Sequence, residues 1–526
     1  MNGPSCIGYP TLGEVLRFVF NATAVLPEKR DLAPDFDCKE RRNVQKLLER
    51  LAEEKGDVSE NAAKAIQQLA FLIAGYIESP SLCLAVGEVI NDLLDVYRQV
   101  IREEGTYLSG KDTLRWMIAE RWAGAAAASI VRNITRFGLR TQREYFPDDP
   151  QWYLPDIDDG KLTLPLAKVM RWIYAQAGLS QTQFHYPQRQ ADERDAGRKH
   201  DLENAQNWYR GRRLPSAAAL DWTFGRGFAS AQARAGAINA ASAKMAFMRQ
   251  NGIRTALFLA RCISFASIEM RKHFGDDFLR RTVKTFVRTL NMALEDAQDA
   301  EDWIVTQAHR TGCSLDDPEL RSYAYDCWTE SLKQRALLAG DQLQSLLQSG
   351  ALDQAEVERM VGTYGPLVVL PSIEMLRAPS EHVVPDGFPE ALYEGVALGR
   401  EHELSGECID AYQARLAASG MDGLLAWMVP WLRFQVCYRR DDHAQAWTMI
   451  EQAFEFARYR AGSDQYVIVN HYIELAAKLG KARAFRKGVY WSRYIGIEVR
   501  WLRDKELTQE NLDFLMTMMS KARYVV

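Results

Sequence analysis

The sequence has 526 residues, of which 47% are hydrophobic and 25% are charged. A chain of this length exceeds what one hydrophobic core can organise, so we expect two to four domains. Its formal net charge of -4 excludes a protein that binds polyanions over its whole surface. Any nucleic-acid interface must therefore be a local basic patch.

The eight cysteines are scattered, with no C-x-x-C pair and no histidine at zinc-finger spacing. This pattern favours free thiols in a reducing compartment, and we predict neither a metal site nor a cofactor. The N-terminus lacks a basic region followed by an apolar segment, which argues against secretion. No apolar run approaches the roughly 20 residues of a membrane span. We therefore expect a cytoplasmic protein without a membrane partner.

Residues 1–144 predict an N-terminal helical domain. From Leu12 to about Arg143 the apolar residues recur at three- and four-residue intervals, which is the period of an α-helix. No grouping of side chains in this segment suggests catalysis.

Residues 145–165 are rich in proline and aspartate and predict an acidic linker or hairpin. The turn of the hairpin would be Asp158-Asp159-Gly160. The alternative is a loose nuclease pattern, in which Asp148 and Asp159 would bind Mg²⁺ and Lys161 would lie near the attacking water. Such short patterns are common by chance, and the helical surroundings do not supply the mixed sheet that this nuclease fold needs. The linker or hairpin is therefore favoured.

The most motif-like stretch of the chain runs from Asn204 to Gly225. A helix is predicted to end at Gly211, since glycine tolerates the left-handed conformation that terminates many helices. Pro215 cannot continue that helix, and Ser216 is a favourable cap for a second one. The prediction is a helix, a tight basic turn and another helix.

This pattern resembles the end of the helix-turn-helix domain of Cro/CI-like (XRE) repressors, whose recognition helix finishes in a run like E-R-G-R-R-x-P-S. Here residues 209–216 read Y-R-G-R-R-L-P-S. Upstream, Leu166 to Gln181 resembles the first helix and the G-L-S-Q entry to the second. A charged insert from Tyr186 to Leu202 departs from those domains, and we expect it to form a solvated loop. The alternative is an ordinary helical hairpin with a basic turn.

The resemblance implies a helix-turn-helix-like module over residues 166–235, with duplex DNA as its partner. In that reading Gln206, Asn207 and Arg210 face base edges, while Arg212 and Arg213 bind phosphate.

Residues 236–380 predict a helical middle domain. One helix, Phe278 to Ala293, places Arg281, Lys284 and Arg288 on one face as a basic stripe. The acidic run from Glu295 to Asp302 is expected to be a solvated face.

Residues 381–526 contain a repeat. Ala411-Tyr412, Ala446-Trp447 and Ala484-Phe485 each follow a short polar turn, at spacings of 35 and 38 residues. This resembles tetratricopeptide (TPR) repeats, which implies antiparallel helix pairs, buried alanines where the helices of a pair cross, and a groove for a protein or peptide. A generic helical bundle is the alternative.

The last long helix is predicted from Ala482 to Arg503. Arg486, Arg493 and Arg500 recur on it every seven residues. Four aromatic side chains lie among them, namely Tyr490, Trp491, Tyr494 and Trp501. Such a helix could bind phosphates and stack bases, or it could be the polar outer face of a closing helix.

Together these patterns predict an all-α, multi-helical protein and, as its function, a non-enzymatic DNA-binding bacterial regulator or sensor. In the peptide-responsive bacterial regulators that this combination resembles, the DNA-binding domain is normally N-terminal, whereas here it would lie mid-chain. One alternative is a helical protein-binding scaffold or adaptor, including one that acts in phage defence. Another is the metal-dependent nuclease. The sequence leaves a homo-oligomer open.

Overall fold

The structure is a computed structural model. The residues that it describes are 11–26, 38–53, 56–77, 80–104, 117–137, 147, 149, 151–158, 160–186, 194–235, 240–312, 314, 317–365, 368–369, 373, 386–497 and 506–521.

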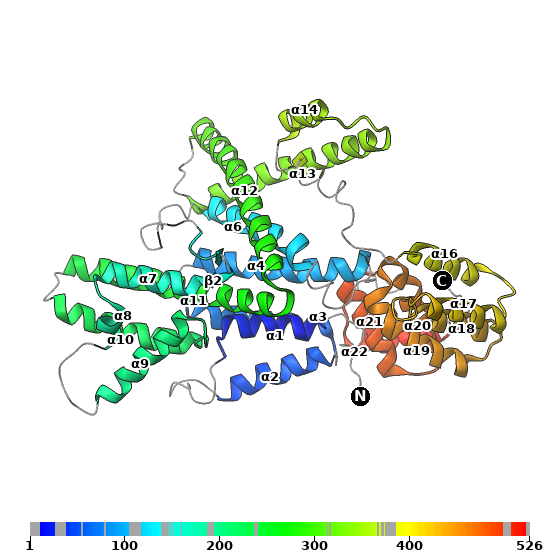
Figure 1. Ribbon diagram of the computed structural model, residues 1–526. Helices are drawn as coiled ribbons and strands as arrows, with labels where there is room; N and C mark the ends of the chain where they lie inside the picture. Colours follow the sequence, from blue (N-terminus) through cyan, green and yellow to red (C-terminus); the bar gives the residue numbers. More distant parts are fainter. Residues whose placement is uncertain are drawn as a thin grey trace.

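The described part of the chain is almost entirely α-helical, as predicted. Its single sheet is a two-stranded antiparallel hairpin of β1 (Asp156–Asp158) and β2 (Lys161–Thr163), located where the sequence places a hairpin. In Figure 1 the N-terminal helices form the centre of the molecule, and one helical lobe lies at each end. The helices of the middle region project from the centre.

The N-terminal helices form the centre of the molecule. They are α1 (Leu12–Thr23), α2 (Cys38–Ala52), α3 (Val58–Ala74), α4 (Pro80–Gln99) and α6 (Ala123–Phe137), with π-helical turns at Val100–Glu104 and Met117–Trp122. Thr11 and Glu14 form a capping box at the start of α1, which satisfies two backbone N–H groups that a helix end leaves unpaired. The helix ends at Ala24, whose φ of 45° is left-handed.

The lobe that holds the basic turn is built from α7 (Pro165–Ala177), α8 (Gln181–His185), α9 (Arg194–Tyr209) and α10 (Ala217–Ala235). The long helix α11 (Ala240–Phe274) packs against α7 and also against α1, so it joins this lobe to the centre.

The middle region continues from α11 into α12 (Asp276–Thr311), α13 (Pro318–Gln348) and α14 (Gln354–Tyr364). Helix α12 packs along α6. Arg281, Lys284 and Arg288 are all exposed on α12, so the predicted basic stripe lies at the surface. The acidic run that follows is not uniformly solvated, because Asp296 is buried and desolvation raises its pKa to about 6.

The C-terminal lobe comprises α16 (Phe388–Arg400), α17 (Gly406–Ala418), α18 (Met428–Arg439), α19 (His443–Arg460), α20 (Gln465–Lys478), α21 (Ala482–Ile495) and α22 (Gln509–Lys521). From α18 to α21 each helix packs against the next in sequence order, with short connections between them. Ala446 is completely buried, as expected for a residue where two helices cross.

Two other alanines of the predicted repeat are not placed as expected. Ala411 is exposed and Ala484 is only half-buried, so the prediction that both are buried at helix crossings is wrong. Neighbouring glycines provide the close contacts instead. A Cβ atom at Gly395 would lie 2.6 Å from the Tyr412 hydroxyl, and one at Gly488 would lie 2.6 Å from Ile473 Cγ1. The repeat pattern predicted helix pairs in this region, but the residues at the close contacts differ from those it indicated.

Helix α21 is shorter than predicted. It ends at Ile495, because Gly496 adopts a left-handed φ of 75° and its N–H bonds to the carbonyls of Ser492 and Arg493. One face of the helix is buried, and the helix contacts α3 and α4 as well as α20. The apolar core of the C-terminal lobe is consequently continuous with that of the N-terminal helices.

Candidate nucleic-acid interface and adjoining cavity

The connection between α7 and α8, at the start of the predicted module of residues 166–235, follows the sequence prediction closely. Helix α7 ends at Gly178, which has a φ of 62°, and the N–H of Leu179 bonds to the Tyr174 carbonyl. Ser180 then begins α8 with a capping box, in which its hydroxyl accepts from the Gln183 N–H and the Gln183 side chain accepts from the Ser180 N–H. The G-L-S-Q run therefore turns the chain from one helix into the next.

An aromatic cluster fixes α8 against α10. The ring centroid of Phe184 lies 5.4 Å from that of Tyr174 and 5.2 Å from that of Phe228. A Cβ atom at Gly227 would lie 2.1 Å from Phe184 Cε1, so only glycine allows this approach. His185 lies in the same cluster, and burial lowers its pKa to about 4, with a further contribution from Arg226. The base of the module is thus a rigid, apolar packing unit.

Helix α9 ends in the motif that the sequence predicts. Gly211 has a φ of 66°, its N–H bonds to the Trp208 carbonyl, and the Arg212 N–H bonds to the Asn207 carbonyl. This pair of bonds is the Schellman arrangement. Ser216 caps α10 by accepting a hydrogen bond from the Ala219 N–H at 3.1 Å. The helix, basic turn and second helix are therefore confirmed.

We call residues 210–213 the arginine turn. Arg210, Arg212 and Arg213 are all exposed, and within the described residues none of their guanidinium groups has an ion-pair or hydrogen-bond partner. Gln206 and Asn207 are half-buried on the preceding turn of α9. The opposite face of α9 faces the module core through Ala205 and Trp208. The sequence-predicted residues thus lie together on the outer side of one helix and its terminal turn.

The charged insert is not the solvated loop that the sequence suggested. From Arg194 onward it forms the first turns of α9, which extend the helix by more than two turns. Asp201 on this extension is 5% exposed and pairs with Arg226 of α10 at 2.5 Å. At least one acidic residue of the insert, Asp201, therefore pairs with a neighbouring helix and is not a solvated charge.

The second predicted basic surface, on α21, lies elsewhere in the molecule. Arg493 is exposed and Arg486 is half-buried, whereas Arg500 and Trp501 lie outside the described residues. Trp491 and Tyr494 are buried, and the Trp491 indole N–H donates to Gln465 at 3.1 Å. These two rings are therefore unable to stack on bases, contrary to the sequence expectation.

The residues of the nuclease pattern are not brought into a metal site by the described structure. Asp148 and Asp159 lie outside the described residues, and Lys161 begins β2 of the short hairpin. In the described part of the chain no cluster of three or more His, Cys, Asp or Glu side chains could hold a metal ion, and no larger sheet is present.

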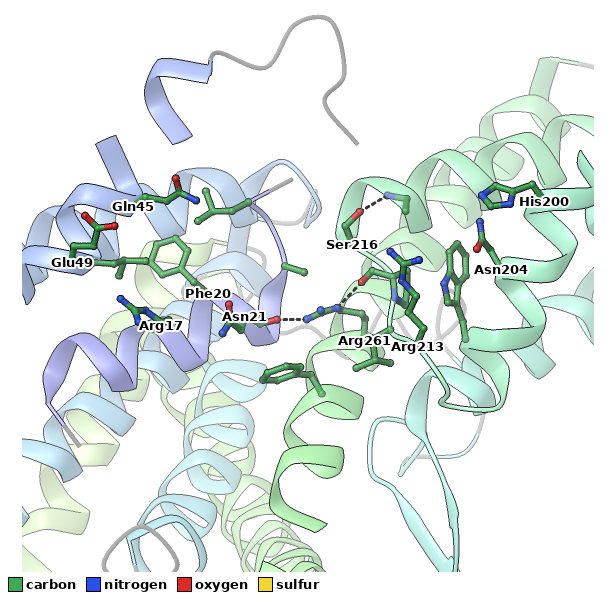
Figure 2. Close-up of a pocket in the computed structure, with 18 residues that line it drawn as sticks. Arg17, Phe20, Asn21, Gln45, Glu49, His200, Asn204, Arg213, Ser216 and Arg261 are labelled. Atoms are coloured by element: carbon green, nitrogen blue, oxygen red, sulfur yellow. Dashed lines mark hydrogen bonds between the residues drawn. The ribbon is translucent and has the colours of Figure 1, made fainter. Parts of the chain in front are cut away.

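A buried arginine that the sequence analysis did not single out joins the module to the N-terminal helices. Arg261, on α11, is 6% exposed. Its guanidinium donates to the Pro215 carbonyl at 2.9 Å and to the Asn21 carbonyl at 2.6 Å, and it also bonds to the Ala22 carbonyl. Two of these acceptors are at the C-terminal end of α1, where a cation is favoured by the helix dipole. Figure 2 shows the Arg261 side chain between the end of α1 and the segment that precedes α10.

A cavity of about 970 Å³ lies beside this arginine, between α1 and α2 on one side and α9 and the start of α10 on the other (Figure 2). We call it the α1–α9 cavity. Its charged and polar lining residues are Arg17, Asn21, Gln45, Glu49, His200, Asn204, Arg213, Ser216 and Arg261. Its apolar lining residues include Phe20, Leu48, Trp208, Leu214 and Phe265. These residues come from segments far apart in sequence, so no local motif could have indicated the cavity.

Comparisons with protein families, with curated protein sequences and with solved structures found no match to this chain. Among the helices described, none is both long and apolar enough to cross a lipid bilayer.

Proposed function

We propose that this protein binds duplex DNA through α9 and the arginine turn, and that it acts as a non-enzymatic regulator or sensor. The observation that carries the proposal is the set of three exposed arginines that have no acidic partner among the described residues, positioned at the end of a helix whose other face is fixed in an aromatic core. Unpaired arginines on a rigid element can neutralise phosphates without first breaking an ion pair.

The local charge supports this proposal. Residues 166–235 contain eleven Lys or Arg and six Asp or Glu, which gives a formal charge of +5, whereas the whole chain carries -4. A basic region in an otherwise acidic protein is the electrostatic pattern expected when only one part of the surface meets DNA.

The arrangement of the helices also fits the helix-turn-helix interpretation. Helix α8 contacts both α9 and α10, and the capped turn at Ser180 and the Gly211 turn match the two turns that the Cro/CI-like resemblance implies. In this arrangement α9 is the recognition helix. Gln206, Asn207 and Arg210 would contact base edges, while Arg212 and Arg213 would contact phosphates.

The test is a series of fluorescence-anisotropy titrations of duplex DNA at several salt concentrations. For the variant with Arg212→Ala and Arg213→Ala, we expect the slope of log K against log salt to fall by about two units, because two phosphate contacts are lost. Arg210→Ala should instead reduce discrimination between DNA sequences.

The matched control replaces Arg415 and Arg433 of the C-terminal lobe with alanine. Both are surface arginines that pair with acidic side chains, Glu394 and Asp410 respectively. This variant removes the same charge and should leave the slope unchanged. If the wild type does not bind duplex DNA at low salt, or if both double variants change the slope equally, the proposal is wrong.

A second function, a scaffold that binds another protein through a TPR-like C-terminal lobe, rests on a separate observation. Tyr393 on α16 is 75% exposed, and Tyr466 and Val467 on α20 are 42% and 43% exposed. Exposed aromatic residues are enriched in protein-binding surfaces. Protein docking here requires no basic surface, so Tyr393→Ala should weaken partner binding and leave any DNA affinity unchanged.

A further inference from the structure

Positive charge is concentrated along the lining of the α1–α9 cavity. Among the described residues, three guanidinium groups line it, from Arg17, Arg213 and Arg261, against one carboxylate, that of Glu49. Arg17 and Arg213 come from opposite walls, and within the described residues neither guanidinium group has an ion-pair or hydrogen-bond partner. Figure 2 shows Arg213 beside Arg261, facing the wall that carries Arg17 and Glu49.

Arg261 differs from the other two because it is buried and already bonded. Its three carbonyl acceptors fix its position, while its charge remains uncompensated by any carboxylate within the described residues. Burial lowers its pKa, which indicates that the environment disfavours the cation. An anion in the cavity would therefore offset the cost of desolvating this cation, as well as pair with Arg17 and Arg213.

The remaining lining is suited to a ligand that is larger than a simple anion. Apolar side chains on both sides, including Phe20, Trp208 and Phe265, lie beside the amide side chains of Asn21 and Asn204. A volume of about 970 Å³ is at the upper end of the range for small-molecule and cofactor sites. A planar ring with hydrogen-bonding edges, linked to a phosphate chain, would use the apolar side chains, the two amides and the arginines of this lining.

We infer that the α1–α9 cavity is a binding site for a phosphorylated small molecule of nucleotide size. The phosphates pair with Arg17 and Arg213 near the fixed charge of Arg261, and the planar part of the molecule lies against the apolar lining. This site is distinct from the outer face of α9, where Gln206, Asn207 and Arg210 lie.

One consequence rests on the proposed DNA-binding function. Arg213 belongs both to the cavity lining and to the predicted phosphate contacts. One guanidinium cannot pair fully with a bound ligand and with DNA, so each ligand weakens the other, and the weakening is reciprocal. The cavity would thereby make DNA binding respond to the concentration of a nucleotide.

The direct test titrates the full chain with a fluorescent N-methylanthraniloyl derivative of ATP, followed by displacement with unlabelled ATP, GTP and inorganic pyrophosphate. We expect saturable binding that ATP or GTP displaces. Arg17→Ala and Arg213→Ala should each lower the affinity by about tenfold or more, because each removes a charge-assisted phosphate contact. Both side chains are exposed, so the fold should persist.

Arg212→Ala is the matched control, since Arg212 lies on the same turn, is exposed and does not line the cavity. It should bind the fluorescent nucleotide as tightly as the wild type. Displacement by pyrophosphate alone, with no effect of unlabelled nucleotides, would overturn the nucleotide assignment. Failure to bind the fluorescent nucleotide, or equal weakening by Arg212→Ala and Arg213→Ala, would overturn the site.

The DNA-binding proposal and the cavity proposal can be refuted independently. Nucleotide binding in a protein that does not bind DNA would support the cavity site while removing the proposed function. DNA binding without nucleotide binding would leave the proposed function and remove this inference. When both ligands bind, adding ATP should weaken DNA binding in the wild type and in Arg212→Ala, but not in Arg213→Ala. Unchanged DNA affinity of the wild type at saturating ATP would overturn the coupling.

Discussion

Arg261→Met is the substitution that best tests how the module is attached to the N-terminal helices. Methionine replaces the apolar stem of the arginine side chain, but it has no guanidinium group to donate to the carbonyls of Pro215, Asn21 and Ala22. The expected result is a local loss of stability at the junction between the end of α1 and the start of α10.

The magnitude follows from the burial of the three acceptors. The bond to the Pro215 carbonyl is buried, and leaving that group unpaired costs about 1–3 kcal/mol. The bonds to Asn21 and Ala22 are only partly buried, and each contributes about 0.5–1.5 kcal/mol. The substitution also removes the desolvation cost of a buried charge, which offsets part of the lost hydrogen-bond energy. We therefore expect a net loss of about 2–4 kcal/mol in stability.

Native-state hydrogen exchange is the appropriate assay, because a chain of 526 residues with several apolar clusters is not expected to unfold with a single free energy. The informative amide is that of Ala217, which donates to the Ala24 carbonyl across the junction at 3.3 Å. Its protection from exchange should fall by roughly 30- to 700-fold in Arg261→Met, since each 1.4 kcal/mol corresponds to a factor of ten.

The control is Arg254→Met on the same helix. Arg254 pairs with Asp221 at 2.6 Å, but both side chains are about one-third exposed, so the loss should be less than about 1 kcal/mol. If Arg261→Met and Arg254→Met reduced the protection of Ala217 by the same factor, the assigned role of Arg261 would be refuted.

Two further predictions concern stability. Because burial lowers the pKa of His185 to about 4, the unfolded chain takes up a proton between pH 6.5 and 4 while the folded chain does not, so stability is lost as the pH falls through this window. Between about pH 7 and pH 5 the loss attributable to His185 should be roughly 2 kcal/mol and should be absent in His185→Gln, as measured by local hydrogen exchange of α8 and α10; an equal pH response in both proteins would contradict it. Ala446→Leu should destabilise the C-terminal lobe by about 1–3 kcal/mol through overpacking. Ala444→Leu, at an exposed position of α19, should have little effect, with local hydrogen exchange of α19 measured for both variants. Equal effects of the two substitutions would show that the packing at Ala446 is not tight.

Local sequence determined the parts of this protein whose physical cause is local. Gly178, Ser180, Gly211 and Ser216 begin and end helices where predicted, because capping and left-handed turns depend on a few adjacent residues. The helical period likewise identified the all-α class, and the dipeptide Asp158-Asp159 with Gly160 located the only hairpin in the described residues.

Tertiary structure decided which side chains meet. The sequence suggested a buried Ala411 and stacking surfaces at Trp491 and Tyr494, but periodicity alone does not show which neighbouring helix covers a given face. The α1–α9 cavity is the clearest case. Arg17 and Arg213 are 196 positions apart in the sequence, and they face the same space only because α11 holds α1 and the arginine turn together through Arg261. Packing over such separations is a property of the whole fold, so no local pattern could have specified it.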